Sequence, residues 1–208
     1  MVRDVHPIEQ ESYAILRARL GARYPGSDAL PPLARAVIER VVHASADLDY
    51  AEDLALPGED TLAAAVRALR DGAPIVADVA MVAAGITKRA AVCRIGDERA
   101  SRLAAEQNLT RSAAALRLAA QETGPGAIYV IGCAPTALFE LVDHPAAYRP
   151  RLVVGLPVGF VGAAESKAAL REAGAAAGLP SISNISAKGG SAVAAAALNA
   201  LLYWEAAA

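Results

Sequence analysis

The chain has 208 residues, of which 20 are Lys or Arg and 22 are Asp or Glu, so its formal net charge is −2. This balance argues against a nucleic-acid-binding protein, which needs an excess of cations to neutralise phosphates. With 55% hydrophobic residues, the chain is too apolar to be disordered, and its length fits a single domain over residues 1–208. Alanine accounts for 52 residues and aromatic residues for only 4%, so we expect a core built by close backbone approach.

Helical patterns dominate the first third of the chain. Apolar residues recur at helical spacing in residues 8–20, in residues 33–45 and from residue 60 to the Asp71-Gly72 turn. Asp60 has the residue type expected of an N-cap for the third of these helices. The chain therefore begins with a predicted helical N-terminal segment.

From residue 74 onward, short strand-like runs bounded by Gly or Pro alternate with helical patterns. The predicted strands are residues 74–78, 91–95, 127–132, 152–157 and 181–186. The helical patterns between and after them cover residues 79–84, 98–107, 110–122, 134–142, 162–171 and 190–203. Such alternation predicts an α/β protein with three α/β/α layers, in which helices cover both faces of a mainly parallel five-stranded sheet.

Small or polar residues follow four of the predicted strands. They are Asp78 and residues 132–136, 155–162 and 188–191. Parallel strands end at one edge of a sheet, where helix N-termini present N–H groups to anions and glycine allows a ligand to approach closely. Turn chemistry and helix capping explain each loop singly, but four such loops at one edge predict a ligand site.

The common nucleotide-binding patterns are absent. Residues 155–162 have the spacing G-x₃-G-x₂-G, unlike the dinucleotide fingerprint, and no acidic residue occurs between Ala173 and Trp204. The Walker pattern does not occur either. The first strand end, residues 78–80, lacks the glycines typical of a methyltransferase that uses S-adenosylmethionine. We expect no cofactor.

Metal, disulfide and membrane signals are also missing. The three histidines, at positions 6, 43 and 144, lack metal-ligand spacing, and Cys93 and Cys133 form neither a CxxC pair nor a disulfide framework. Residues 1–10 have no apolar signal-peptide core, and the most apolar run, residues 191–204, is shorter than the roughly 20 residues that span a bilayer. We expect a cytoplasmic protein with no metal and no membrane segment.

His43 is the histidine best placed for chemistry. Helical spacing sets Glu39 and Asp47 one turn either side of it, where a carboxylate would orient the imidazole. The pattern alone leaves open that His43 is a solvated helix residue.

Eight motifs in order resemble the precorrin-8X methylmutase (precorrin isomerase) family of cobalamin (vitamin B12) biosynthesis, and residues 155–167 are the most specific of them. The motifs are residues 8–12 with Ile15 and Arg17, residues 40–44, 72–78, 81–82 with 85–87, 110–114, 134–139, 155–167 and 188–192.

This resemblance implies a cofactor-free isomerase that acts as a homodimer. Its reaction is a 1,5-sigmatropic shift of a methyl group from C-11 to C-12 of precorrin-8X, which gives hydrogenobyrinate. His43 matches the family's functional histidine and would be the general acid, a role suited to an imidazole near neutral pH. The alternatives are a cobalt-precorrin-8 methylmutase of the anaerobic route and a corrinoid carrier with little turnover. A methyltransferase that uses S-adenosylmethionine is the third alternative.

The resemblance and the residue chemistry together predict the substrate contacts. Arg111 and Ser112 would clamp a carboxylate, and Met81 would contact the apolar ring. Lys167 and Lys188 would either bind carboxylates or be solvated. The predicted substrate-binding residues are Ser12, Arg17, Met81, Val82, Ile86, Thr87, Arg111, Ser112, Thr136, Gly159, Lys188, Gly189, Gly190 and Ser191.

The chain departs from the family pattern in four places. Cys133 replaces a common Asn, Ala80 replaces an acidic residue, and Ser45-Ala46 replaces Cys-Gly after the histidine. Residues 185–187 replace a Gly-Arg pair, which removes a cation and puts part of the expected carboxylate recognition in doubt.

Overall fold

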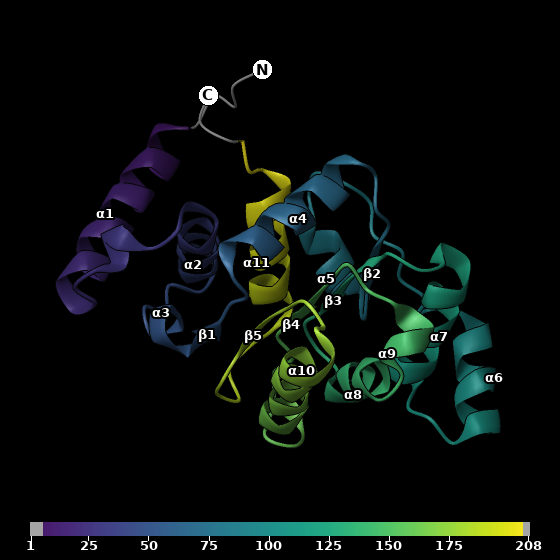
Figure 1. The fold of residues 1–208 in the computed structure, drawn as a ribbon. Coiled ribbons are helices and arrows are strands. Elements are labelled where there is room, and N and C mark those ends of the chain that lie inside the picture. The colour runs from purple at the N-terminus through teal and green to yellow at the C-terminus, as the bar shows by residue number, and fades with distance from the viewer. Residues whose placement is uncertain (1–5, 206–208) are drawn as a thin grey trace.

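A five-stranded sheet forms the centre of the protein in the computed structural model, which describes residues 6–205 (Figure 1). The strand order is β1-β5-β4-β3-β2, and all neighbours are parallel except β1, which pairs antiparallel with β5. The strands are β1 (Leu54–Ala55), β2 (Ile75–Ala77), β3 (Ile128–Ile131), β4 (Leu152–Gly155) and β5 (Ser181–Asn184).

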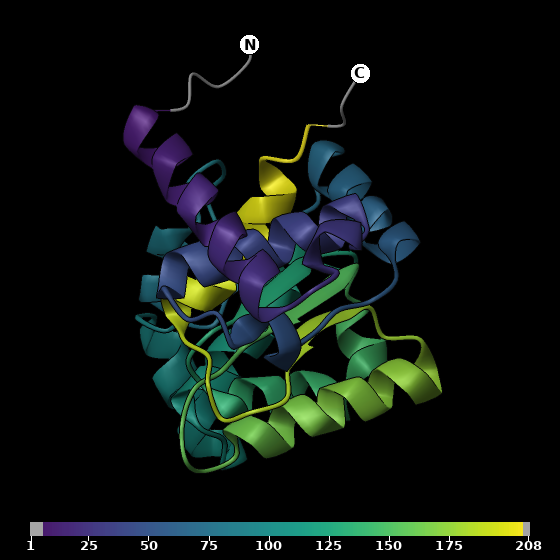
Figure 2. The ribbon, with the colours of Figure 1, turned by 90° about the vertical axis from the view of Figure 1, so that its left-hand side faces the viewer.

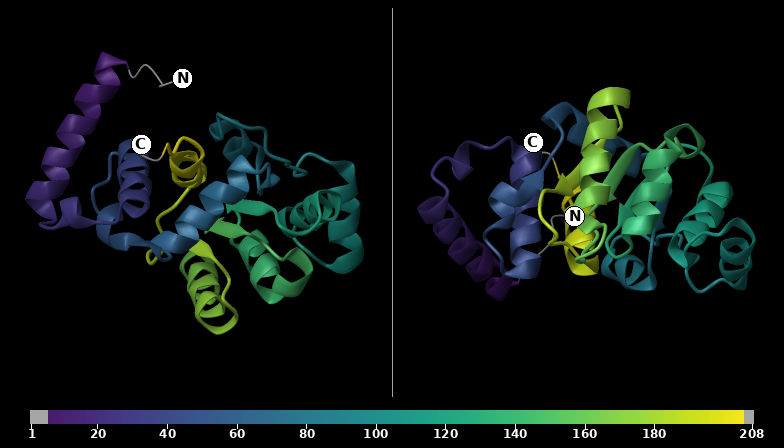
Figure 3. Two further views of the ribbon diagram at one scale, coloured as in Figure 1. Left: turned by 45° about the horizontal axis from the view of Figure 1, so that its top comes forward. Right: turned by 90° about the horizontal axis from the view of Figure 1, so that it is seen from below.

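Helices cover both faces of the sheet, which gives the predicted three layers. On one face lie α2 (Pro32–Ser45), α4 (Glu59–Arg70), α5 (Ala80–Gly85) and α11 (Ser191–Leu202), with α1 (Pro7–Arg23) packed outside α2 (Figures 1 and 3). On the other lie α7 (Arg111–Thr123), α8 (Pro135–Asp143), α9 (Pro145–Tyr148) and α10 (Ala163–Ala177) (Figure 2). The remaining helices are η1 (Ser27–Ala29), α3 (Tyr50–Asp53) and α6 (Glu98–Gln107). Within residues 6–205, none of the helices combines the length and apolarity needed to cross a bilayer.

The central strands are buried on both faces. In β3, Ile128 and Val130 belong to the core under α2 and α11, whereas Tyr129 and Ile131 belong to the core above α8 and α10. This division follows from the alternation of side chains along a strand. It explains why the predicted strand was an unbroken apolar run rather than an alternating one.

One predicted strand is absent from the sheet, and one strand of the sheet was not predicted. Residues 91–95 do not form a strand, because only Val92 pairs, in an isolated bridge with Val76 of the edge strand β2. The fifth strand is instead β1, whose two residues close the opposite edge of the sheet against β5. A strand this short carries no periodicity that would identify it from sequence.

The expected role of Asp60 was also wrong. The third long helix, α4, begins at Glu59 with Gly58 as its N-cap, and no side chain caps it. The neighbouring carboxylate of Glu59 instead accepts from the backbone N–H groups of Leu33 and Ala34, at 2.8 and 3.3 Å. A residue from α4 therefore caps the N-terminus of α2, a tertiary contact that local pattern does not reveal.

Small residues bring α11 close to its neighbours, as the alanine content predicted. A Cβ added to Gly85 would lie 2.7 Å from Cβ of Ala195, and one added to Gly132 would lie 2.8 Å from Cβ of Ala194. Real Cβ atoms do not approach so closely, so both positions require glycine. The apolar helix α11 is thus seated directly on α5 and on the end of β3.

Ala46 ends α2 in a left-handed conformation, with φ of 55°. An L-residue with a Cβ is strained there by about 1 kcal/mol, whereas glycine is not. Ala46→Gly is therefore expected to raise the free energy of unfolding by about 1 kcal/mol in urea denaturation. Ala44→Gly, in the last turn of the same helix, is the control and is expected to lower it by about 1 kcal/mol. A destabilised Ala46→Gly protein would contradict the prediction.

Candidate functional site

The C-terminal ends of β2, β3, β4 and β5 meet at one edge of the sheet, as the parallel pairing requires. Two of the loops at this edge pack backbone against backbone. The N–H of Gly190 donates to the carbonyl of Leu156 at 2.9 Å, and the N–H of Gly159 donates to the carbonyl of Ala187 at 3.3 Å. The glycine-bearing loops after β4 and β5 therefore form one continuous surface.

Asp78 occupies the anion-binding position at the start of α8. Its buried carboxylate accepts from the N–H groups of Gly132, Cys133 and Ala134 at 2.8–3.1 Å. Burial raises the pKa of Asp78 above its usual value, and the three N–H donors oppose that rise. These three N–H groups are thus already paired within the protein and are not available to a substrate carboxylate.

Asp78→Ala is expected to lower the free energy of unfolding by about 3 kcal/mol, because three buried N–H groups lose their acceptor. Urea denaturation measures the loss. Asp97→Ala is the control, since Asp97 is a partly exposed N-cap that accepts from one backbone N–H, that of Arg99, and otherwise pairs with the Arg99 side chain; about 1 kcal/mol is expected there. Equal losses in the two variants would contradict the role given to Asp78.

Arg111, Ser112 and Thr136 come together at the edge, as predicted. The Thr110 hydroxyl caps α7 and lies 2.8 Å from the Thr136 hydroxyl in the first turn of α8. This contact sets the starts of the two helices side by side. Arg111 is exposed there and, among the residues that the structure describes, has no ion-pair or hydrogen-bond partner.

His43 and Ser12 line a cavity of about 180 Å³ between α1 and α2, together with Ile15, Leu16 and Arg19 and, from the end of α2, Val42, Ala46 and Leu48. The imidazole is half-buried and lies parallel to the ring of Tyr13, with 4.6 Å between ring centroids and an interplanar angle of 1°. Tyr13 was not predicted, because a contact between two separate helices leaves no local signal.

The carboxylates expected to flank His43 are paired elsewhere. Glu39 is buried and accepts hydrogen bonds from Arg17, at 2.8–3.1 Å, and from Arg35, at 2.7 Å. Burial acts to raise the pKa of Glu39, but these hydrogen bonds outweigh it and lower the pKa. The expected role of Arg17 at the substrate pocket is thus not supported, because its guanidinium ties α1 to α2.

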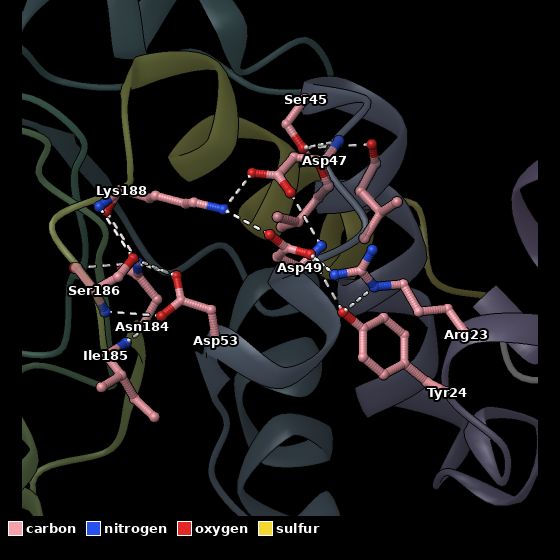
Figure 4. A network of polar contacts seen from close by, with 12 residues as sticks. Arg23, Tyr24, Ser45, Asp47, Asp49, Asp53, Asn184, Ile185, Ser186 and Lys188 are labelled. Carbon is pink, nitrogen blue, oxygen red and sulfur yellow. Dashed lines mark hydrogen bonds and ion pairs between the residues drawn. The ribbon is translucent and has the colours of Figure 1, made fainter. Parts of the chain in front are cut away.

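Asp47 is paired with Lys188 instead. The Lys188 ammonium lies 2.7 Å from Asp47 and 3.4 Å from Asp49, which also binds Arg23 at the end of α1 (Figure 4). This pairing lowers the pKa of Asp47 and raises that of Lys188. Asp47 stands between Ala46 and Leu48, which both line the histidine cavity, so Lys188 links this cavity to the glycine loops at the edge of the sheet.

Several predicted contact residues lie away from this surface. Val82 and Ile86 are buried in the core, where a ligand does not reach their side chains. Thr87 binds Asn199 and Tyr203 at the C-terminal end of α11, the end opposite Ser191. These residues were expected at the substrate because they belong to the motif of residues 81–82 and 85–87, but the structure points them away from the exposed surface at Met81. Met81 itself is exposed at the edge.

Lys167 is neither solvated nor free to bind a substrate. Its side chain is fully buried, and its ammonium donates to the side chain of Asn184 and to two backbone carbonyls. Asn184 and Asp53, which binds the same segment, were not predicted as functional residues. Their contacts join segments far apart in the chain, so no spacing pattern signals them.

Exposed apolar side chains gather at the same edge. Seven large hydrophobic residues are exposed within residues 6–205, and five of them follow the C-terminal end of a parallel strand. These five are Met81, Val158, Phe160, Val161 and Ile185. An apolar rim of this kind marks a surface for a partner or a large ligand rather than ordinary solvent-facing structure.

Comparison with known proteins agrees with this arrangement. The precorrin-8X methylmutase family model matches residues 7–204. The chain is 39% identical to the cobalt-precorrin-8 methylmutase of Salmonella typhimurium, over 97% of this chain and 96% of that one. It is 40% identical to the precorrin-8X methylmutase of Pseudomonas aeruginosa, over 96% of each. A crystal structure of precorrin-8X methylmutase from Thermus thermophilus has a TM-score of 0.80 and 34% identity, with 94% of this chain and 93% of that one covered. The chain therefore belongs to the precorrin-8X methylmutase family.

Proposed function

We propose that this chain is the isomerase that converts precorrin-8X to hydrogenobyrinate in cobalamin biosynthesis, by moving a methyl group from C-11 to C-12 of the ring. Membership of the family supports the reaction class. Substrate and product are isomers, so the protein has to supply positioning and a proton rather than an external group.

The observation that carries the proposal is the apolar rim at the C-terminal edge of the sheet. The substrate is a broad, flat, apolar ring fringed with carboxylates. Exposed Met81, Val158, Phe160 and Val161 supply apolar contact without a deep pocket. Gly159 and Gly190, both with φ above +120°, keep the adjoining loops free of bulk.

Cations and backbone N–H groups around this rim are the proposed binding partners of the substrate carboxylates. Arg111 is exposed without an ion-pair partner in the described part of the chain, so its guanidinium is available for a bidentate contact. Ser112 and Thr136 lie beside it. At the other side of the rim, Ser191 starts the long helix α11, whose first N–H groups attract anions. Lys188 is already held by Asp47 and contributes positive charge rather than a free contact.

His43 is the proposed general acid. Protonation of the macrocycle makes its π-system a better acceptor for the migrating methyl group. Because the product has the same composition as the substrate, the proton returns once migration is complete, and the neutral imidazole is the base at hand. Tyr13 fixes the plane of the ring by stacking.

The test is direct. Purified protein is mixed with precorrin-8X, and the absorbance spectrum is followed for conversion to hydrogenobyrinate; a parallel sample contains the cobalt-bearing substrate, because relatives carry both names. No spectral change with either substrate would overturn the proposal. Tight product binding without turnover would favour a corrinoid carrier, and calorimetric binding of S-adenosylmethionine would favour a methyltransferase.

A homodimer in the cytoplasm completes the proposal. The resemblance to the family supports the dimer. Light scattering after size exclusion measures the mass, and a monomer that turns over substrate at full rate would remove the dimer from the proposal. Cell fractionation tests the location.

A further inference from the structure

The segment between β5 and α11, residues 185–190, is held in place from three directions; we call it the Lys188 loop. The Lys188 side chain binds Asp47 beyond α2. Gly190 donates to the carbonyl of Leu156 in the loop after β4. The third attachment comes from beneath, through Lys167 of α10 and Asp53 of α3, and Figure 4 shows Asp53 against Asn184 and Ser186.

Lys167 binds the inner side of this loop. Its Nζ donates to Oδ1 of Asn184 at 2.8 Å and to the carbonyls of Ser186 and Lys188 at 2.6 Å each. The side chain has no solvent exposure. An ammonium group has three N–H donors, and here three acceptors meet them, so the loop is wrapped around a single cation.

Asp53 binds the same loop beside Lys167, through Asn184 and two backbone N–H groups. Its carboxylate accepts from the N–H groups of Ile185 and Ser186, at 3.1 and 2.7 Å, and from Nδ2 of Asn184 at 2.7 Å. Burial acts to raise the pKa of Asp53, but the hydrogen bonds from Asn184 and Ser186 outweigh it and lower the pKa. Asp53 therefore stays ionised as the pH rises, whereas Lys167 loses its charge.

We propose that Lys167 is a positioning residue: in its ammonium form it holds the Lys188 loop in the shape that receives the substrate. The inference rests on the proposed function, because it takes this loop as part of the substrate surface. Lys167 does not touch the substrate; it acts through the backbone of Ser186 and Lys188. Its loss raises KM and leaves the proton transfer by His43, and thus kcat, largely intact.

The charge on Lys167 is sensitive to mildly alkaline pH. Burial lowers its pKa to about 8; ionised Asp53 opposes this shift and Arg171, also on α10, adds to it. A neutral amine has two N–H donors for the three acceptors. The loop is then expected to loosen, so KM rises above about pH 8.

Global stability changes in the opposite direction. The pKa of Lys167 in the folded protein is below its unfolded value of 10.5, so between about pH 8 and 10.5 the unfolded chain binds more protons. Through this group, stability therefore rises with pH in that window. A rise in KM above about pH 8 is thus not explained by unfolding linked to the titration of Lys167.

Steady-state kinetics between about pH 6.5 and 9.5 test the proposal. Lys167→Met is expected to raise KM by about tenfold at neutral pH, to flatten its pH dependence and to leave kcat within about threefold. Lys167→Arg keeps the charge and is expected to restore part of the affinity and to lack the alkaline rise. Lys88→Met is the matched control, because Lys88 also binds a backbone carbonyl, that of Leu202, but at the far end of α11. A KM within about twofold of wild type for Lys167→Met would overturn the proposal.

A second readout needs no substrate. In the wild-type protein, the amide resonances of Gly189 and Gly190 are expected to shift with a midpoint near pH 8, and in Lys167→Met this titration is expected to vanish. Its absence from the wild type would overturn the proposal whether or not the protein turns over precorrin-8X. A protein that shows the titration but no turnover would instead refute the proposed function and retain the attachment of the loop to Lys167.

Discussion

Replacing His43 with glutamine is expected to lower kcat by about 10²–10⁴-fold, the usual contribution of a positioned general acid. Glutamine keeps a polar side chain in the cavity between α1 and α2 but has no proton to transfer near neutral pH. Affinity for hydrogenobyrinate is expected to change little, because the proposed carboxylate contacts, Arg111 and the start of α11, are unchanged in this variant. Steady-state absorbance kinetics and titration with hydrogenobyrinate measure the two quantities separately.

His144→Gln is the matched control for this experiment. His144 follows α8 at the end away from the sheet edge, and its Nδ1 lies 3.0 Å from the carbonyl of Glu140. The same chemical change at that position is expected to leave kcat unaltered. A His43→Gln enzyme with kcat within about threefold of wild type would remove His43 from the mechanism. Loss of product binding together with kcat would show that the substitution had damaged the pocket.

The gathering of the loops after β2, β3, β4 and β5 at one edge of the sheet could be predicted because it depends on topology. Strands of the β3 and β4 type are apolar on both faces, and such strands occur in parallel sheets covered by helices. Their C-terminal ends then have to share one edge of the sheet. Topology alone therefore predicts that the loops after these strands lie close together. The same reasoning did not identify β1, because two residues are too few to show a period.

The side-chain partners at the site could not be predicted in the same way. Helical spacing placed Glu39 one turn before His43, which is correct because both lie on α2, whereas Asp47 lies beyond the helix, which ends at Ser45. However, Arg17 reaches Glu39 from α1, and Lys188 reaches Asp47 from 141 residues further along the chain. A buried carboxylate is stabilised by whichever cation the tertiary structure brings to it. Spacing along one helix therefore predicts which groups are near and not which groups pair.

Lys167 illustrates the same limit for a buried residue. In the sequence, Lys167 is the last residue of the motif at residues 155–167. A lysine at that position was expected to be a solvated surface residue or to bind a carboxylate. The structure turns it inward, where the carbonyls of Ser186 and Lys188 replace solvent. Only the return of the chain through β5 supplies those acceptors, so no spacing pattern in the sequence predicts the contact between Lys167 and this loop.

Gly189→Ala is expected to lower the free energy of unfolding by about 2–5 kcal/mol and to raise KM through distortion of the Lys188 loop. A Cβ at this position would lie 2.4 Å from the carbonyl oxygen of Leu156 and 2.5 Å from that of Pro157. Both obstacles are backbone atoms, so the two loops would have to separate, which breaks the hydrogen bond from Gly190 to Leu156. The positive φ of 155° adds strain.

Gly190→Ala separates these two causes. Its φ of 130° is also in the region that favours glycine, but a Cβ there meets no atom within 4 Å. Backbone strain alone is expected to cost about 1–3 kcal/mol. Urea denaturation of both variants, with KM measured for each, therefore isolates the cost of pushing the loops apart. If Gly190→Ala were as destabilised as Gly189→Ala, strain would account for both losses, and the close contact between the loops after β4 and β5 would not be what holds this side of the substrate surface.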